Sequence, residues 1–189
     1  MRPWFLLFIV VAIGPAAAPP AAVRDEIAVL REDCRLDGAP LVPRPGFLRR
    51  FDVNRDGRMD IVMDLARLNC GRFSSGYCGS AGCRINVFIS TPRGYANVLR
   101  HTVHAVRLFT TRGETVVVVQ FHGGICGRAG AERCQQRLVW RGGDFCGVPA
   151  RSTPYSPGVE PAFPPCEPRR GRGPGRVSAL GRLAHQPGG

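Results

Sequence analysis

Oxygen-bearing side chains alternate along residues 52–60, which read Asp-Val-Asn-Arg-Asp-Gly-Arg-Met-Asp. Calcium prefers about six to eight oxygen ligands, and a tight loop can direct side chains at positions 1, 3, 5 and 9 and the carbonyl at position 7 toward one centre. Gly57, at position 6, allows the sharp bend that such a loop requires. The spacing therefore predicts a structural calcium site whose ligands are Asp52, Asn54, Asp56, the backbone carbonyl of Arg58, and Asp60.

Two features of the same loop favour an alternative without metal. Asp52 and Asn54 belong to the residue types that hydrogen-bond their own backbone in Asx turns. Arg55 and Arg58 bring positive charge into the loop and should weaken cation binding. Converging carboxylates repel one another without a cation, however, so we expect calcium to bind with a dissociation constant of about 10⁻⁴–10⁻³ M and to act as a structural clip.

The loop resembles the D-x-N-x-D-G-x-x-D calcium loops that join β-strands in integrin-type FG-GAP repeats. The resemblance implies that the residues at the matching positions are calcium ligands. An EF-hand is excluded because position 12 is Met63 in place of glutamate and a strand candidate follows. The motif occurs once in this chain, so the resemblance does not imply the propeller that tandem repeats would build.

A wider resemblance spans residues 47–141. The loop is followed by Tyr-Cys-Gly-Ser-Ala-Gly-Cys at 77–83 and by His-Gly-Gly-Ile-Cys at 122–126. This order of motifs resembles that of small exported cysteine-rich bacterial proteins without an assigned activity. It implies a compact exported domain and supplies no reaction.

Eight cysteines indicate a disulfide framework, because their number is even and a secretory signal precedes them. Short glycine-rich loops separate two local pairs, and a third pair would tie the N-terminal segment to a sheet. The expected pairs are Cys34 with Cys70, Cys78 with Cys83, and Cys126 with Cys134. Cys146 and Cys166 remain, either paired or partly free. No C-x2-C spacing suggests a zinc site.

His122 and Cys126 supply the alternative chemistry. A thiolate beside an imidazolium is a nucleophile pair, and the backbone amides of Gly123 and Gly124 could receive an oxyanion. An exported chain usually consumes such cysteines in disulfides, and Cys134 is an obvious partner. His101, His104 and His122 could in principle bind zinc, but His101 and His104 would point to opposite faces of a strand.

The N-terminus has the layout of a signal peptide. Arg2 precedes an apolar run from Trp4 to Ile13, and small residues follow, so residues 1–22 are assigned to export and the protein to the periplasm or the exterior. The net charge is +12, and all 26 basic residues are arginine. This charge is spread along the chain, which favours loose attraction to anionic surfaces but specifies no partner. The candidate partners are an anionic envelope surface or a protein, and nucleic acid is not expected for an exported protein.

The remaining pattern predicts a mainly β fold, a single small antiparallel-sheet domain at 23–146 with a short N-terminal helix at 23–35. Strand candidates lie at 47–51, 60–65, 84–90, 96–100, 102–110 and 114–121, with a closing hairpin at 135–146. Residues 147–189, rich in proline, glycine and arginine, are expected to be a disordered tail.

These observations favour an exported, calcium-clipped, disulfide-stabilised module without catalytic activity, which binds a partner or associates with the cell envelope. The alternative is a cell-envelope enzyme that uses the loop containing His122 and Cys126.

Overall fold

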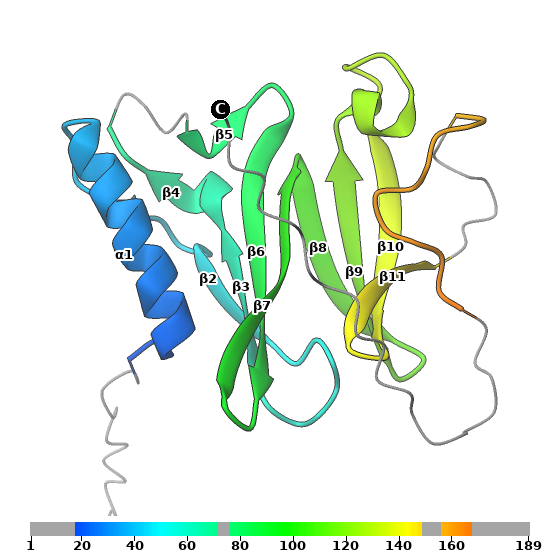
Figure 1. Cartoon of the computed structure of the whole chain (residues 1–189), viewed down its shortest axis with the longest axis horizontal. Helices are drawn as coiled ribbons and strands as arrows, with labels where there is room; N and C mark the ends of the chain where they lie inside the picture. The colour runs from blue at the N-terminus through cyan, green and yellow to red at the C-terminus, as the bar shows by residue number, and fades with distance from the viewer. Residues whose placement is uncertain (1–17, 72–75, 149–155, 168–189) are drawn as a thin grey trace, which may run out of the picture.

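One helix and two antiparallel sheets form three layers in the computed structural model, which describes residues 18–71, 76–148 and 156–167 (Figure 1). Helix α1, Ala21–Leu36, covers the outer face of the first sheet. The first sheet contains β2 (Leu48–Phe51), β3 (Asp60–Asp64), β6 (Gly82–Thr91), β7 (Gly94–Val103) and the short β5 (Cys78–Gly79). The second contains β8 (Ala105–Thr111), β9 (Glu114–Phe121), β10 (Cys134–Arg141) and β11 (Asp144–Val148). The expected mainly β fold with an N-terminal helix is confirmed.

Short elements complete the chain. A two-residue strand, β1 (Val42–Pro43), pairs antiparallel with β4 (Leu68–Asn69). Single 3-10 turns lie at Leu65–Arg67 and Gly123–Cys126.

Helix α1 presents one apolar face to the first sheet because Val23, Leu30 and Cys34 recur at helical spacing and are fully buried. Burial of each large aliphatic side chain stabilises the helix on the sheet by about 1.5–3 kcal/mol. The helix ends where Gly38 adopts φ +74°, and the N–H of Ala39 then donates to the carbonyl of Cys34. The helix exposes polar residues such as Asp25 and Glu32 to solvent, whereas Glu26 contacts the sheet.

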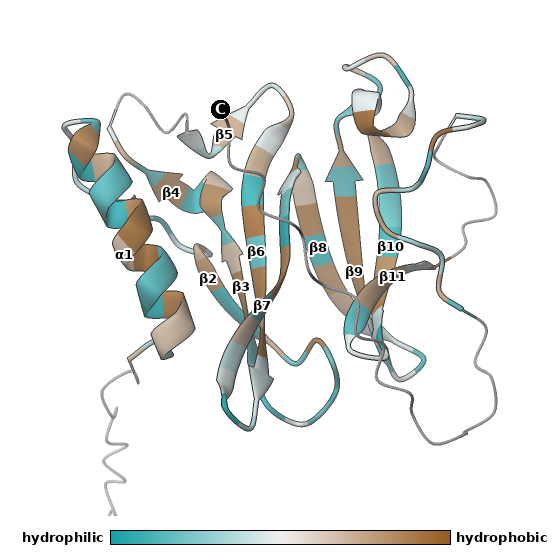
Figure 2. Ribbon diagram, viewed as in Figure 1, coloured by the Kyte–Doolittle hydropathy of each residue, from teal (hydrophilic) through white to brown (hydrophobic). Residues whose placement is uncertain are grey.

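The core lies between the two sheets. Alternate residues of β6, such as Ile85 and Val87, face Val117 of β9 and Leu138 of β10, and all four are almost completely buried. Strand β9 runs between β8 and β10, as its unbroken valine run predicted. Apolar residues follow the strands that face one another across the middle of the molecule (Figure 2).

The chain crosses from the first sheet to the second at His104. The sequence predicted one strand over 102–110, but β7 ends at Val103 and β8 begins at Ala105. The N–H of His104 donates to the carbonyl of Gln120 on β9, which turns the chain onto the second sheet. Val103 and Val106 both pack toward the core although they are three residues apart. In a continuous strand, residues three apart point to opposite faces, so this spacing marks the corner between the two strands.

All eight cysteines lie in described segments and are paired. The disulfides Cys34–Cys70, Cys78–Cys83 and Cys126–Cys134 coincide with the expected pairs. The question left open by the sequence is resolved by a fourth disulfide, Cys146–Cys166.

Residues 156–167 correct the prediction that the whole of 147–189 is disordered. This segment, here called the strap, packs Val159, Ala162 and Phe163 against the core. Its Pro165 forms a parallel bridge with Gly147, and the N–H of Cys166 donates to the carbonyl of Gly147 at 2.9 Å. The domain therefore extends past residue 146, because β11 reaches Val148 and the strap adds to its edge.

The N-terminal limit of the domain also differs, since α1 begins at Ala21, inside the predicted signal segment. Most of that segment, residues 1–17, lies outside the described residues, as do 149–155 and 168–189 of the predicted tail. Within the described ranges no helix has both the length and the apolar character needed to span a membrane.

Candidate functional site

The 52–60 loop connects β2 to β3 and lies where the two sheets meet at one end of the molecule (Figure 1). Phe51 and Asp60 pair at its base, because the strands on either side are antiparallel neighbours. The hydroxyl of Thr115 on β9 donates to the carbonyl of Asp52 at 3.0 Å. The loop is thus attached to both sheets.

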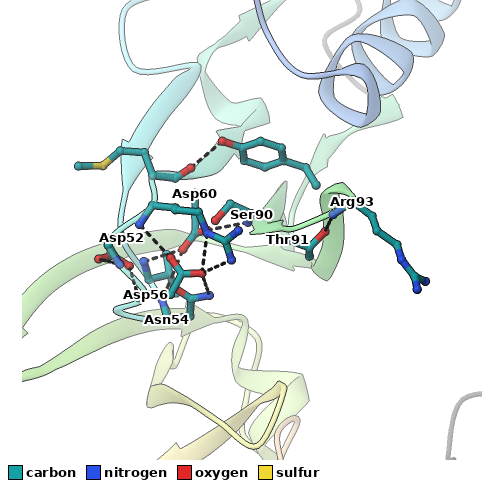
Figure 3. A network of polar contacts seen from close by, with 12 residues as sticks. Asp52, Asn54, Asp56, Asp60, Ser90, Thr91 and Arg93 are labelled. Atoms are coloured by element: carbon teal, nitrogen blue, oxygen red, sulfur yellow. Dashed lines mark hydrogen bonds and ion pairs between the residues drawn. The ribbon is translucent and has the colours of Figure 1, made fainter.

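Asp60 holds the loop from beneath and is fully buried. One carboxylate oxygen accepts the N–H of Val53 at 2.7 Å and that of Asn54 at 3.4 Å. The other oxygen accepts the N–H of Ser90 on β6 at 2.7 Å (Figure 3). A buried carboxylate that accepts several backbone N–H groups keeps its charge satisfied by hydrogen bonds.

The upper half of the loop is organised by Asx interactions. Oδ1 of Asp52 and Oδ1 of Asn54 both lie 3.1 Å from the N–H of Asp56, and Oδ2 of Asp52 accepts the N–H of Gly57 at 3.0 Å. Gly57 adopts φ +84°, as expected for the bend. The arrangement brings side-chain oxygens from positions 1 and 3 to the same N–H group, as in an Asx turn.

Asp56 is paired with a cation from its own loop. The guanidinium of Arg58 contacts Oδ2 of Asp56 at 2.7 Å, and the backbone N–H of Arg58 donates to Oδ1 at 2.9 Å (Figure 3). The Arg58 side chain lowers the pKa of Asp56 to about 2, so the carboxylate is ionised at neutral pH.

The donor chemistry of this loop suits a hard cation, since carboxylate and amide oxygens are the ligands that calcium prefers. The guanidinium of Arg58 already occupies the position of a cation beside Asp56. Within the described segments, no three acidic, histidine or cysteine side chains are arranged to hold a metal ion. To coordinate one, Asp52 and Asp56 would therefore have to turn from the backbone N–H groups and from Arg58.

The alternative site at His122 and Cys126 lacks its nucleophile. Cys126 is buried and bonded to Cys134, so it has no thiol to ionise. Nδ1 of His122 accepts the N–H of Gly124 at 3.2 Å and caps the following 3-10 turn. The structure therefore contradicts the thiolate–imidazolium hypothesis.

The three histidines considered as zinc ligands do not lie together: two of them stack on each other and the third packs elsewhere. His104 and His122 stack with ring centroids 6.1 Å apart, whereas His101 packs against Phe121 and Phe163. Burial, assisted by Arg133 and His122, lowers the pKa of His104. His104 and His122 form a stacked pair at the corner where the chain passes from the first sheet to the second.

Sequence reasoning missed a groove beside the 52–60 loop. It considered Arg55 only as a charge that weakens cation binding, but Arg55 lines this groove together with Arg50 of β2. The groove joins residues from two sheets, so no pattern within a single strand could have predicted it.

The fold and site define a small disulfide-stabilised, mainly β domain in which an Asx-rich loop joins the two sheets. Four disulfides are consistent with an oxidising, extracytoplasmic location. No protein-family model matches this chain, and neither does any curated protein or solved structure with which it was compared.

Proposed function

We propose that this chain is an exported binding module without catalytic activity, and that calcium clips its 52–60 loop. The observation that carries the proposal is the position of this loop, whose oxygen-rich residues touch β6 through Asp60 and β9 through Asp52. A cation bound there would link the two sheets.

The disulfides support the proposal for a module that works outside the cytoplasm. Cross-links stabilise a small extracytoplasmic domain, and those of this chain tie the helix, the loops and the strap to the sheets. With Cys126 in a disulfide, no observation favours the enzyme alternative.

The proposed calcium ion would have a structural role because all of its ligands would come from one short loop. All five ligands come from nine consecutive residues, so a bound ion would be enclosed by its own chain with little room for substrate. Binding would compete with Arg58 for Asp56, which keeps the expected affinity in the range of about 10⁻⁴–10⁻³ M.

Thermal unfolding of the oxidised protein in chelator and in 10 mM Ca²⁺ tests this proposal. A ligand that binds only the folded state at that affinity should raise Tm by about 5–10 °C. The variant Asp56→Ala should lose the response. Asp25→Ala, an exposed acid on α1, should retain it. Mg²⁺, which demands a tighter octahedral geometry, should have a smaller effect.

An unchanged Tm in wild type, together with no heat of binding by calorimetry, would remove calcium from the proposal. An equal response in Asp56→Ala would move the ion to another part of the chain.

A further inference from the structure

A surface groove of about 350 Å³ lies between the 52–60 loop and the end of β8. Its lining residues are Arg50, Phe51, Asp52, Arg55, Met59 and Thr110. They come from β2, from the loop and from β8, so the groove spans the edges of both sheets.

Two arginines of this groove are exposed and have no partner among the residues that the structure describes. Within the described part of the chain, neither Arg50 nor Arg55 makes a hydrogen bond or an ion pair through its guanidinium. Arg58, by contrast, is held by Asp56. Each free guanidinium carries donors in a planar fork, which matches the oxygens of a carboxylate, phosphate or sulfate.

The backbone of Arg55 adopts a left-handed conformation that is unfavourable for an arginine. Arg55 and Arg112 have φ +63° and +47°, and among the described residues they are the only non-glycine residues with positive φ. A left-handed conformation is unfavourable for an arginine because its Cβ comes too close to the following carbonyl oxygen, and glycine or asparagine would adopt it more easily.

Both strained arginines lie at the same end of the molecule. Arg112 and Gly113 form the two-residue turn between β8 and β9, where Asn-Gly is the favoured pair. Arg112 lies two residues after Thr110, which lines the groove. Of the two, Arg55 is itself in the lining, where it places a positive charge at a position that local backbone preference would give to another residue.

The groove also has an apolar wall. Met59 is 53% exposed, and its carbonyl accepts the hydroxyl of Tyr95 at 2.7 Å, which fixes the backbone there. Phe51, which also lines the groove, is partly buried and packs against the core between the two sheets. Asp52, the one acid in the lining, has both oxygens occupied by the N–H groups of Asp56 and Gly57.

We propose that this groove binds a small anion that carries an oxyanion group on an apolar body. Arg50 and Arg55 bind the oxyanion, and Phe51 and Met59 contact the apolar part. The groove shares Asp52 with the proposed calcium ligands, but binding of the anion by the two arginines does not require the metal.

Calorimetric titration of the oxidised full-length protein with phenyl phosphate, in chelator at fixed ionic strength, tests the proposal. Saturable binding is expected. Inorganic phosphate, which lacks the apolar body, and benzyl alcohol, which lacks the charge, should each bind at least about tenfold more weakly. The use of chelator keeps this result independent of the calcium experiment.

Two variants locate the site. Arg50→Ala and Arg55→Gly should each weaken phenyl phosphate binding by about tenfold or more, because each removes a charge-assisted pair. Arg55→Gly also relieves the backbone at φ +63°, so its Tm should equal or exceed that of wild type, which separates lost binding from lost folding. Arg93→Ala is the matched control, since Arg93 extends away from the loop (Figure 3).

The proposal is overturned if phenyl phosphate does not saturate, if inorganic phosphate or benzyl alcohol binds equally well, or if Arg50→Ala and Arg55→Gly bind as wild type does. An equal loss in Arg93→Ala would also overturn it, since attraction to the overall charge would then explain the binding.

Discussion

Asp60 is the residue on which the conformation of the 52–60 loop depends most. Its carboxylate is fully buried and accepts N–H groups from two positions of the loop and from Ser90 on the neighbouring strand. Asp52 and Asp56, by contrast, bond within the exposed part of the loop. Asp60 therefore has a structural role even without metal.

We predict that Asp60→Asn lowers the free energy of unfolding by about 2–3 kcal/mol, because an amide N–H₂ would face a backbone N–H and leave a buried donor unpaired. Denaturant unfolding in chelator measures this effect without any contribution from calcium. Asp64→Asn is the matched control on the same strand. Among the described residues the Asp64 side chain accepts one hydrogen bond, from the N–H of Ala66 at the start of a 3-10 turn, so its replacement should cost less. Equal stability of Asp60→Asn and wild type would contradict this role.

At the scale of elements, α1 is held on the first sheet by a polar clamp as well as by its apolar face. Glu26 has a side chain only 12% exposed and contacts Arg84 of β6 at 3.0 Å and Arg100 of β7 at 2.6 Å. The amide of Asn86, which is fully buried, donates to the same carboxylate at 3.1 Å. The clamp fixes the position of the helix along strands that are distant in sequence.

We expect Glu26→Gln to destabilise the domain by about 2 kcal/mol, because Arg84 would keep a partly buried charge without its carboxylate. Thermal and denaturant unfolding measure the loss. Glu32→Gln on the same helix removes an exposed pair with Arg35 and should leave stability unchanged within error. If both variants unfold alike, the clamp does not anchor the helix.

At the scale of the whole molecule, the strap closes the sandwich beside β11. The ring centroid of Phe163 lies 6.3 Å from that of Phe121 and 5.7 Å from that of His101, so the strap covers a core residue of β9 and a partly buried residue of β7. The amide of Gln136 donates to the carbonyl of Phe163 at 2.8 Å, and Cys146–Cys166 fixes the end of the strap. The strap is part of the folded domain.

Phe163→Ala should therefore lower the free energy of unfolding by about 2 kcal/mol, less than the 3–5 kcal/mol of a fully buried phenylalanine because this ring is only half-buried. Glu160→Ala, an exposed strap residue, should have no effect. Urea unfolding of the oxidised proteins makes the comparison. A wild-type midpoint for Phe163→Ala would show that the strap contributes nothing to the core.

Local physical constraints determined much of this protein from sequence alone. The alternation of Ile61 and Met63 with Val62 reflects the period of a strand between two layers, and the spacing of Leu30 and Cys34 reflects a helix face. The pairs Cys78–Cys83 and Cys126–Cys134 close short loops, which makes them the nearest partners.

Apart from the Cys34–Cys70 disulfide, the long-range contacts named below were decided only by the tertiary structure. Four features join residues that lie far apart in the sequence, so no helix or strand periodicity could predict them. They are the corner at His104, the clamp from Glu26 to Arg100, the strap that ends at Cys166, and the groove between Arg50 and Thr110. Each feature depends on which distant surfaces pack together with the lowest total free energy, and that free energy is a sum over the whole chain. The residue types of the 52–60 loop were evident in the sequence, whereas the hydrogen-bond partners of Asp60 and Asp56 were settled by the packing of the strands around them.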